Sequence, residues 1–161
     1  IAQQAKALDA VLDAILVPCG GGGLIAGTAL AIRHHCPETE IYSVEPEEFD
    51  DTRRSLQSGR RETVAGGAAS FCDALRVPTP GELTFPINRR LLTSGLVVSD
   101  AEVARAMTAC FRHFSLVAEP GGAVALAAVL TGALDCRGRT VAVVCSGGNV
   151  DAETYRAALK P

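Results

Sequence analysis

Short apolar runs alternate with helical patterns along the chain. Residues 14–17 and 140–144 are almost continuously apolar, as expected for strands that are buried on both faces of a sheet. We predict strands at 14–17, 40–44, 95–98 and 140–144, and helices at 1–12, 22–35, 47–57, 99–114, 119–133 and 151–159. Strands separated by helices indicate an α/β fold with three layers, in which a parallel sheet carries helices on both faces.

Two local patterns refine this prediction. The helix at 99–114 has a clear start, because Ser99 and Glu102 form a capping-box pattern and an amphipathic stripe follows them. The segment 72–88 contains three prolines, so we predict an ordered loop with one short helix there.

A run of four glycines is the strongest functional signal. Residues 18–24 read Pro-Cys-Gly-Gly-Gly-Gly-Leu and lie between a predicted strand and a predicted helix. Glycines allow backbone N–H groups to converge, and a helix N-terminus favours negative charge, so the run predicts a phosphate site. A tight turn packed under the sheet is the alternative. Ile25 and Ala26 break the dinucleotide pattern G-x-G-x-x-G, and no Gly-Lys-Ser/Thr loop is present, because the only lysines are Lys6 and Lys160.

Composition narrows the classes of partner. The 161 residues carry a net charge of −3 without a basic run, which argues against nucleic acid as a partner. No apolar stretch approaches the roughly 20 residues that span a membrane, so we predict no membrane partner. The six cysteines show no C-x-x-C pair. Small buried thiols in a reducing compartment explain them best, so we predict a cytoplasmic protein.

Further polar residues follow the other predicted strands. An acidic cluster occupies 45–51, Ser146 and Gly147 open a second glycine turn, and Glu119 precedes a helix that begins with proline. In a parallel sheet, ligands bind beyond the carboxyl ends of the strands. Each group also has a plain structural interpretation: a solvated helix start, a turn and an N-cap, respectively.

Taken together, four motifs resemble the serine/threonine dehydratase family. The motifs are Pro18 to Leu24, Val44-Glu-Pro46, Glu119-Pro-Gly-Gly-Ala123 and Ser146-Gly-Gly-Asn149, and the resemblance runs from about residue 14 to 149. The family consists of fold-type II pyridoxal-phosphate enzymes and includes serine racemase and threo-3-hydroxyaspartate dehydratase. The resemblance implies part of the large domain of such an enzyme.

The resemblance also implies roles for individual residues. In the cofactor site, the backbone of Gly20, Gly21, Gly22, Gly23 and Leu24 would hold the phosphate of pyridoxal 5'-phosphate. Ser146 would face the pyridine nitrogen beside Gly147, where a hydroxyl favours elimination. Glu119 would be the catalytic residue near cofactor and substrate.

A divalent cation site is implied as well. Glu45, Asp51 and the carbonyl of Phe49 match the cation site of the family, and oxygen ligands suit Mg²⁺ or Ca²⁺.

The implied activity is that of an ammonia-lyase of amino-acid metabolism. It converts serine- or threonine-type hydroxy-amino acids to 2-oxo acids and ammonia, in a homo-oligomer (dimer or tetramer). The Schiff-base lysine of the family lies in a Ser-x-Lys motif that this sequence lacks. We therefore expect residues 1–161 to be a C-terminal portion without the lysine segment and the small domain, and to be inactive alone. A serine racemase-type isomerase and a non-catalytic truncated phosphate-binding chain are the alternatives.

Overall fold

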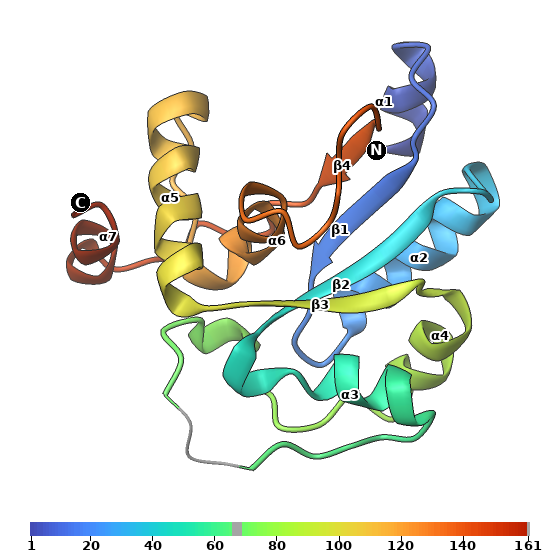
Figure 1. Ribbon diagram of the computed structural model, residues 1–161, viewed down its shortest axis with the longest axis horizontal. Coiled ribbons are helices and arrows are strands. Elements are labelled where there is room, and N and C mark those ends of the chain that lie inside the picture. The colour runs from blue at the N-terminus through green and yellow to red at the C-terminus, as the bar shows by residue number, and fades with distance from the viewer. Residues whose placement is uncertain (66–68, 161) are drawn as a thin grey trace.

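The computed structural model describes residues 1–65 and 69–160 and contains one four-stranded parallel sheet (Figure 1). The strand order is β3-β2-β1-β4. The strands are β1 (Ala14–Pro18), β2 (Glu40–Pro46), β3 (Ser94–Val98) and β4 (Val141–Val143). The predicted α/β class and the parallel sheet are confirmed.

Helices cover both faces of the sheet, because side chains alternate along the strands. Ala14 and Leu16 of β1 pack in one apolar cluster with the helices α5 (Asp100–Phe114) and α6 (Pro120–Leu130). Ile15 and Val17 pack in a second cluster with α2 (Gly23–His35), which contacts α4 (Thr84–Leu91). The other helical elements are α1 (Ala2–Ala7), η1 (Glu47–Phe49), α3 (Asp51–Ser58), η2 (Asp73–Leu75) and α7 (Ala152–Ala158).

Several predicted boundaries are wrong. The first helix ends at Ala7 rather than at residue 12, because Asp9 adopts a positive φ of 50° that a helix cannot contain. The helix predicted at 47–57 is divided, since Asp50 separates the 3-10 turn η1 from α3. The capping box of Ser99 and Glu102 is confirmed at the start of α5.

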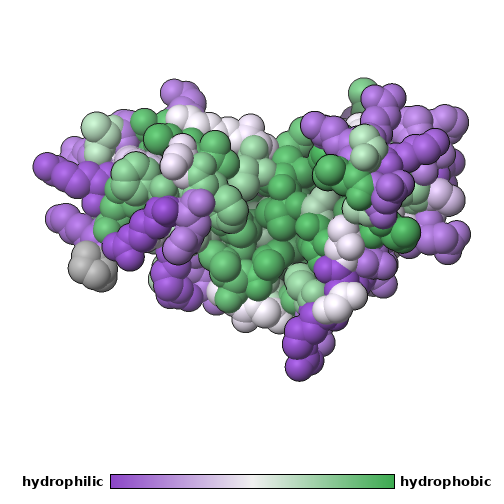
Figure 2. Space-filling view, turned by 90° about the horizontal axis from the view of Figure 1, so that it is seen from above, coloured by the Kyte–Doolittle hydropathy of each residue, from purple (hydrophilic) through white to green (hydrophobic). Residues whose placement is uncertain are grey.

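All four strands run in the same direction, so the turns after β1, β2 and β4 lie at one edge of the sheet. Strand β4 is an edge strand, and its three residues are only half-buried. Figure 2 shows that the face seen from above is apolar in its middle and polar towards both ends. In the described part of the chain, every helix is too short or too polar to cross a membrane.

Candidate functional site

The glycine turn lies directly after β1 and opens into α2. The N–H of Cys19 still bonds to the Val44 carbonyl of β2 at 2.9 Å, and α2 begins four residues later at Gly23. In the described part of the chain, none of the N–H groups from Gly20 to Leu24 donates to a protein acceptor. Gly23 and Leu24 are exposed, so the turn is not packed shut. Unpaired N–H groups at a helix N-terminus form a cradle for an anion such as phosphate.

The opposite side of this turn is held by the segment before and within α4. The Gly21 carbonyl accepts hydrogen bonds from the Thr84 hydroxyl at 2.6 Å and from the Gly81 N–H at 3.2 Å. The Gly22 carbonyl accepts one from Nδ2 of Asn88 at 3.3 Å, in addition to the bond from the Ala26 N–H at the start of α2. The turn is therefore anchored by its carbonyls.

Gly22 has a structural reason to be glycine. Its φ is +84°, which L side chains rarely adopt. A Cβ at this position would lie 2.6 Å from Nδ2 of Asn88, on the α4 side of the turn. A side chain at Gly22 would therefore disturb the turn itself; blocking the approach of the phosphate is not the primary effect.

The second glycine turn, after β4, lies against the start of α6. The N–H of Glu119 donates to the Gly147 carbonyl at 3.0 Å, and Oε2 of Glu119 accepts from the N–H of Asn149 at 3.1 Å. A Cβ on Gly147 would lie 2.1 Å from Oε1 of Glu119. Ser146 is exposed, so its hydroxyl is accessible. The structure thus joins Glu119 to the turn that contains Ser146 and Gly147.

The acidic cluster that begins in the last residues of β2 is divided: Glu45, Asp50 and Asp51 are buried, whereas Glu47 and Glu48 are exposed as at a solvated helix start. Glu45 is buried; its Oε1 accepts from the N–H of Thr52 and its Oε2 from the N–H of Arg53, each at 2.8 Å. Glu45 thereby caps the N-terminus of α3 from the neighbouring strand. Burial raises the pKa of Glu45 to about 8, and the nearby charge of Asp51 adds to the effect.

Asp51 lies beside Glu45 and is less well satisfied. Both carboxylate oxygens of Asp51 are buried without a hydrogen-bond partner among residues 1–65 and 69–160, and burial raises the pKa of Asp51 to about 7. Phe49 is buried in the intervening turn. Among the described residues, no group of three or more His, Cys, Asp or Glu side chains is arranged to hold a metal ion. A cation here would therefore need a backbone carbonyl as an additional ligand.

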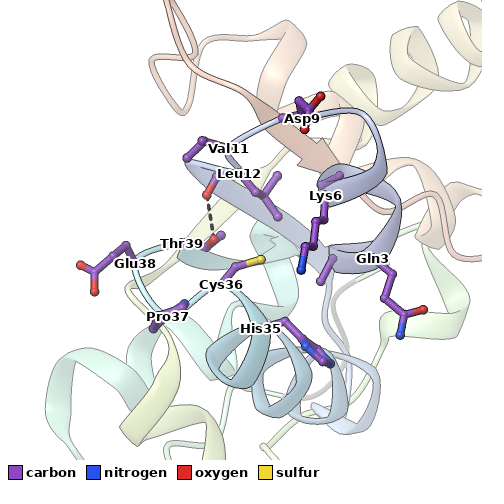
Figure 3. Close-up of a pocket in the computed structure, with 13 residues that line it drawn as sticks. Gln3, Lys6, Asp9, Val11, Leu12, His35, Cys36, Pro37, Glu38 and Thr39 are labelled. Atoms are coloured by element: carbon purple, nitrogen blue, oxygen red, sulfur yellow. Dashed lines mark hydrogen bonds between the residues drawn. The ribbon is translucent and has the colours of Figure 1, made fainter.

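The two lysines lie away from these turns. Lys6 lines a cavity of about 540 Å³ at the amino edge of the sheet (Figure 3). Cys36 at the end of α2 lines the same cavity, and there the Thr39 hydroxyl donates to the Leu12 carbonyl at 2.7 Å. Lys160 is exposed after α7.

A family model described as "Pyridoxal-phosphate dependent enzyme" matches residues 1–147. The chain belongs to this family. The match contains all four motifs except the last two residues of the second glycine turn.

The chain is similar to an ammonia-lyase, a deaminase and a racemase. It is 40% identical to an L-threo-3-hydroxyaspartate ammonia-lyase of Pseudomonas sp over 149 residues, which are 92% of this chain and 46% of that protein. The crystal structure of a threonine deaminase from T.th. matches with a TM-score of 0.88 at 39% identity, over 92% of this chain and 50% of the other. The structure of maize serine racemase matches with a TM-score of 0.85 at 31% identity, over 98% of this chain and 48% of the racemase chain. The chain spans about half the length of these relatives.

Thr84 and Asn88 contact the candidate site and were not predicted from the sequence. They lie one helical turn apart on the same face of α4, and Asn88 is fully buried. The signal in the sequence is a polar pair at i and i+4 that begins three residues after the Pro80-Gly81 dipeptide. Its target, the glycine turn 63 residues earlier, is visible only in the fold.

Proposed function

We propose that this chain forms the phosphate-binding part of an enzyme that releases ammonia from a hydroxy-amino acid. The observation that carries the proposal is the turn at Gly20 to Gly23. Its N–H groups have no protein acceptor among the described residues, while side chains of α4 donate hydrogen bonds to the carbonyls of Gly21 and Gly22. The ammonia-lyase and deaminase names of similar proteins support the reaction class.

The turn fits the phosphate of pyridoxal 5'-phosphate. The N–H groups of Gly20 to Leu24 would donate to the phosphate oxygens, and the N-terminus of α2 would favour their negative charge. A Cβ at Gly21 or Gly23 would meet no atom of the described residues within 4 Å, so the turn is open where it does not contact α4.

The second turn supplies groups suited to the cofactor ring and the substrate. When bound, pyridoxal phosphate draws electrons from the α-carbon of an amino acid, which lets the α-proton and the β-hydroxyl leave. We propose that Ser146, beside Gly147, hydrogen-bonds the ring nitrogen without forcing its protonation, and that Glu119 accepts or donates a proton near the substrate. The exposure of Ser146 and the contact between Glu119 and Gly147 support these roles.

The experiment measures 2-oxo acid release by the protein at its natural length, with pyridoxal phosphate and threonine, serine or threo-3-hydroxyaspartate. We expect Glu119→Gln to slow turnover about 100-fold while the Kd for pyridoxal phosphate changes less than about threefold. Gly23→Val, whose Cβ would meet no atom of the described residues within 4 Å, should weaken cofactor binding without lowering Tm. Cofactor binding that Gly23→Val leaves unchanged would contradict the assignment of the turn.

Racemisation is the second candidate, since maize serine racemase is 31% identical to this chain. Measuring D-serine alongside 2-oxo acid from L-serine separates the two reactions. D-serine formed faster than 2-oxo acid would favour the isomerase.

We expect residues 1–161 alone to show no turnover. Lys6 at the amino edge and exposed Lys160 after α7 support this expectation, because neither lies at the glycine turns. Release of 2-oxo acid by this chain alone would contradict it. The cytoplasmic location and the homo-oligomeric state stay predictions.

We propose, finally, that Glu45, Asp51 and the Phe49 carbonyl bind Mg²⁺ or Ca²⁺. The buried, unpartnered oxygens of Asp51 support a cation, and each Glu45 oxygen retains a lone pair beyond its N–H bond. Added Mg²⁺ or Ca²⁺ should raise Tm, and Asp51→Asn should abolish the response, whereas the exposed control Glu48→Gln should keep it. If neither Mg²⁺, Ca²⁺ nor a chelator changes the Tm, the result would contradict the cation site.

A further inference from the structure

We infer that Thr84 and Asn88 are positioning residues that aim the N–H groups of the glycine turn at the phosphate. The inference rests on the proposed function and deepens it, because it assigns the orientation of the anion cradle to two side chains of α4. Neither residue would touch the phosphate; both act through the backbone of the turn.

The geometry of the peptide plane connects the two sides of the turn. In a trans peptide the carbonyl of one residue and the N–H of the next point in opposite directions. Thr84 holds the Gly21 carbonyl towards α4 with a hydrogen bond of 2.6 Å, so the N–H of Gly22 points away from α4. The Gly22 carbonyl accepts from Nδ2 of Asn88 at 3.3 Å and from the N–H of Ala26, in the first turn of α2, at 3.0 Å, so the N–H of Gly23 points away from both donors.

Glycine makes this external support necessary. Consecutive glycines have access to both signs of φ, and their peptide planes can rotate at little steric cost. The N–H of Gly81 bonds to the same carbonyl as the Thr84 hydroxyl, and the N–H of Ala26 bonds to the same carbonyl as Asn88. Two side-chain donors of α4 and two backbone donors therefore fix two successive planes. The support reduces the entropy that the turn would lose when it binds an anion.

Asn88 offers a way to separate positioning from plain structural support. Its side chain is fully buried, and its Oδ1 has no hydrogen-bond partner in the described part of the chain. Asn88→Leu removes this unsatisfied acceptor along with the donor to Gly22, so folding stability should not fall. A positioning role predicts weaker phosphate binding in a variant that is equally stable.

The test uses the protein at its natural length and two probes, pyridoxal phosphate by calorimetry and inorganic phosphate by amide NMR of ¹⁵N-glycine-labelled protein. We expect Thr84→Val to raise the Kd for pyridoxal phosphate about tenfold and Asn88→Leu about fivefold. Thr84→Ser, which keeps the hydroxyl, should restore the Kd to within about threefold of the wild type. The phosphate-induced shifts of the Gly22 and Gly23 N–H signals should shrink in Thr84→Val and Asn88→Leu.

Thr108→Val is the matched control. The Thr108 hydroxyl also bonds one carbonyl in its own helix and one in a distant segment, Ala104 and Ala158, each at 3.1 Å. The Thr108→Val variant should have a lower Tm than the wild type and an unchanged Kd for pyridoxal phosphate. Wild-type Kd values in both Thr84→Val and Asn88→Leu would overturn the inference and leave the proposed function standing. Failure of the wild type to bind either probe at the Gly22 and Gly23 N–H groups would overturn both.

Discussion

Two glycine turns follow neighbouring parallel strands, and a cysteine precedes each, but they are stabilised differently. The turn at Gly20 to Gly23 follows the buried central strand β1, and side-chain donors from α4 hold its carbonyls. The turn at Ser146 to Asn149 follows the half-buried edge strand β4, and it lies against Glu119 and the backbone of α6. The first turn is held through its carbonyls, and its N–H groups have no acceptor among the described residues. The second turn forms hydrogen bonds with Glu119 and also packs closely against the backbone of α6.

The difference shows that a glycine can be required for opposite reasons. At Gly22 the requirement is a positive φ and contact with polar side chains. At Gly122 in α6 it is the approach of a helix to a turn, because a Cβ there would lie 2.6 Å from the Gly147 carbonyl oxygen. Side chains can move aside more readily than a backbone, so substitutions at the second turn should cost more.

The largest effect is expected for Gly122→Ala. The new methyl group would collide with the backbone of Gly147, so we expect a loss of about 2 kcal/mol in the free energy of unfolding and a fall in Tm of roughly 5 °C. Gly27→Ala is the control, because this exposed helical glycine has no atom within 4 Å of its added Cβ. It should gain about 0.5–1 kcal/mol from helix propensity. If urea unfolding gave the same change in the free energy of unfolding for Gly122→Ala and Gly27→Ala, the result would contradict the close approach of α6 to the second turn.

Gly22→Ala should have the next largest effect. A non-glycine residue at a φ of +84° costs about 1–2 kcal/mol, and contact with Asn88 adds to this. Gly21→Ala has no neighbouring atom within 4 Å and should leave the free energy of unfolding almost unchanged. Thermal unfolding of the two variants tests the difference, and a destabilised Gly21→Ala would show that the open side of the turn is filled.

Glu119→Ala should act weakly and locally. It removes the acceptor for the Asn149 N–H, and we expect a loss of about 0.5–1 kcal/mol because this hydrogen bond is exposed and water can replace the carboxylate. Hydrogen exchange should speed up at residues 146–149 and stay constant at residues 20–24. Faster exchange in both turns would mean that they are coupled, against the separate support described above.

Alkylation of the two cysteines compares the turns without altering the fold. Burial, with a further contribution from the charge of Glu45, raises the pKa of the Cys19 thiol well above its ordinary value, whereas Cys145 is exposed. Iodoacetamide at pH 8 should therefore modify Cys145 in the native protein and Cys19 only after urea is added. Mass spectrometry of the peptides gives the rates, and native labelling of Cys19 at the rate of Cys145 would show that the first turn opens.

The sequence by itself determined the α/β class and the position of both glycine turns. Continuous apolar runs between helical patterns indicate strands buried on two faces, and four consecutive glycines after such a strand mark a backbone site. The motifs also indicated the family, and the family match confirmed it. These features are local, since each depends on residues that are adjacent in the chain.

Tertiary structure alone decided how the site is supported. Thr84 bonds a carbonyl 63 residues away, and Glu119 contacts a turn 30 residues later. Burial likewise made Asp51 an unpartnered carboxylate rather than a solvated acid at a helix start. Such contacts follow from strand order and helix packing, which place distant residues together by the geometry of the whole sheet; local periodicity has no information about that geometry.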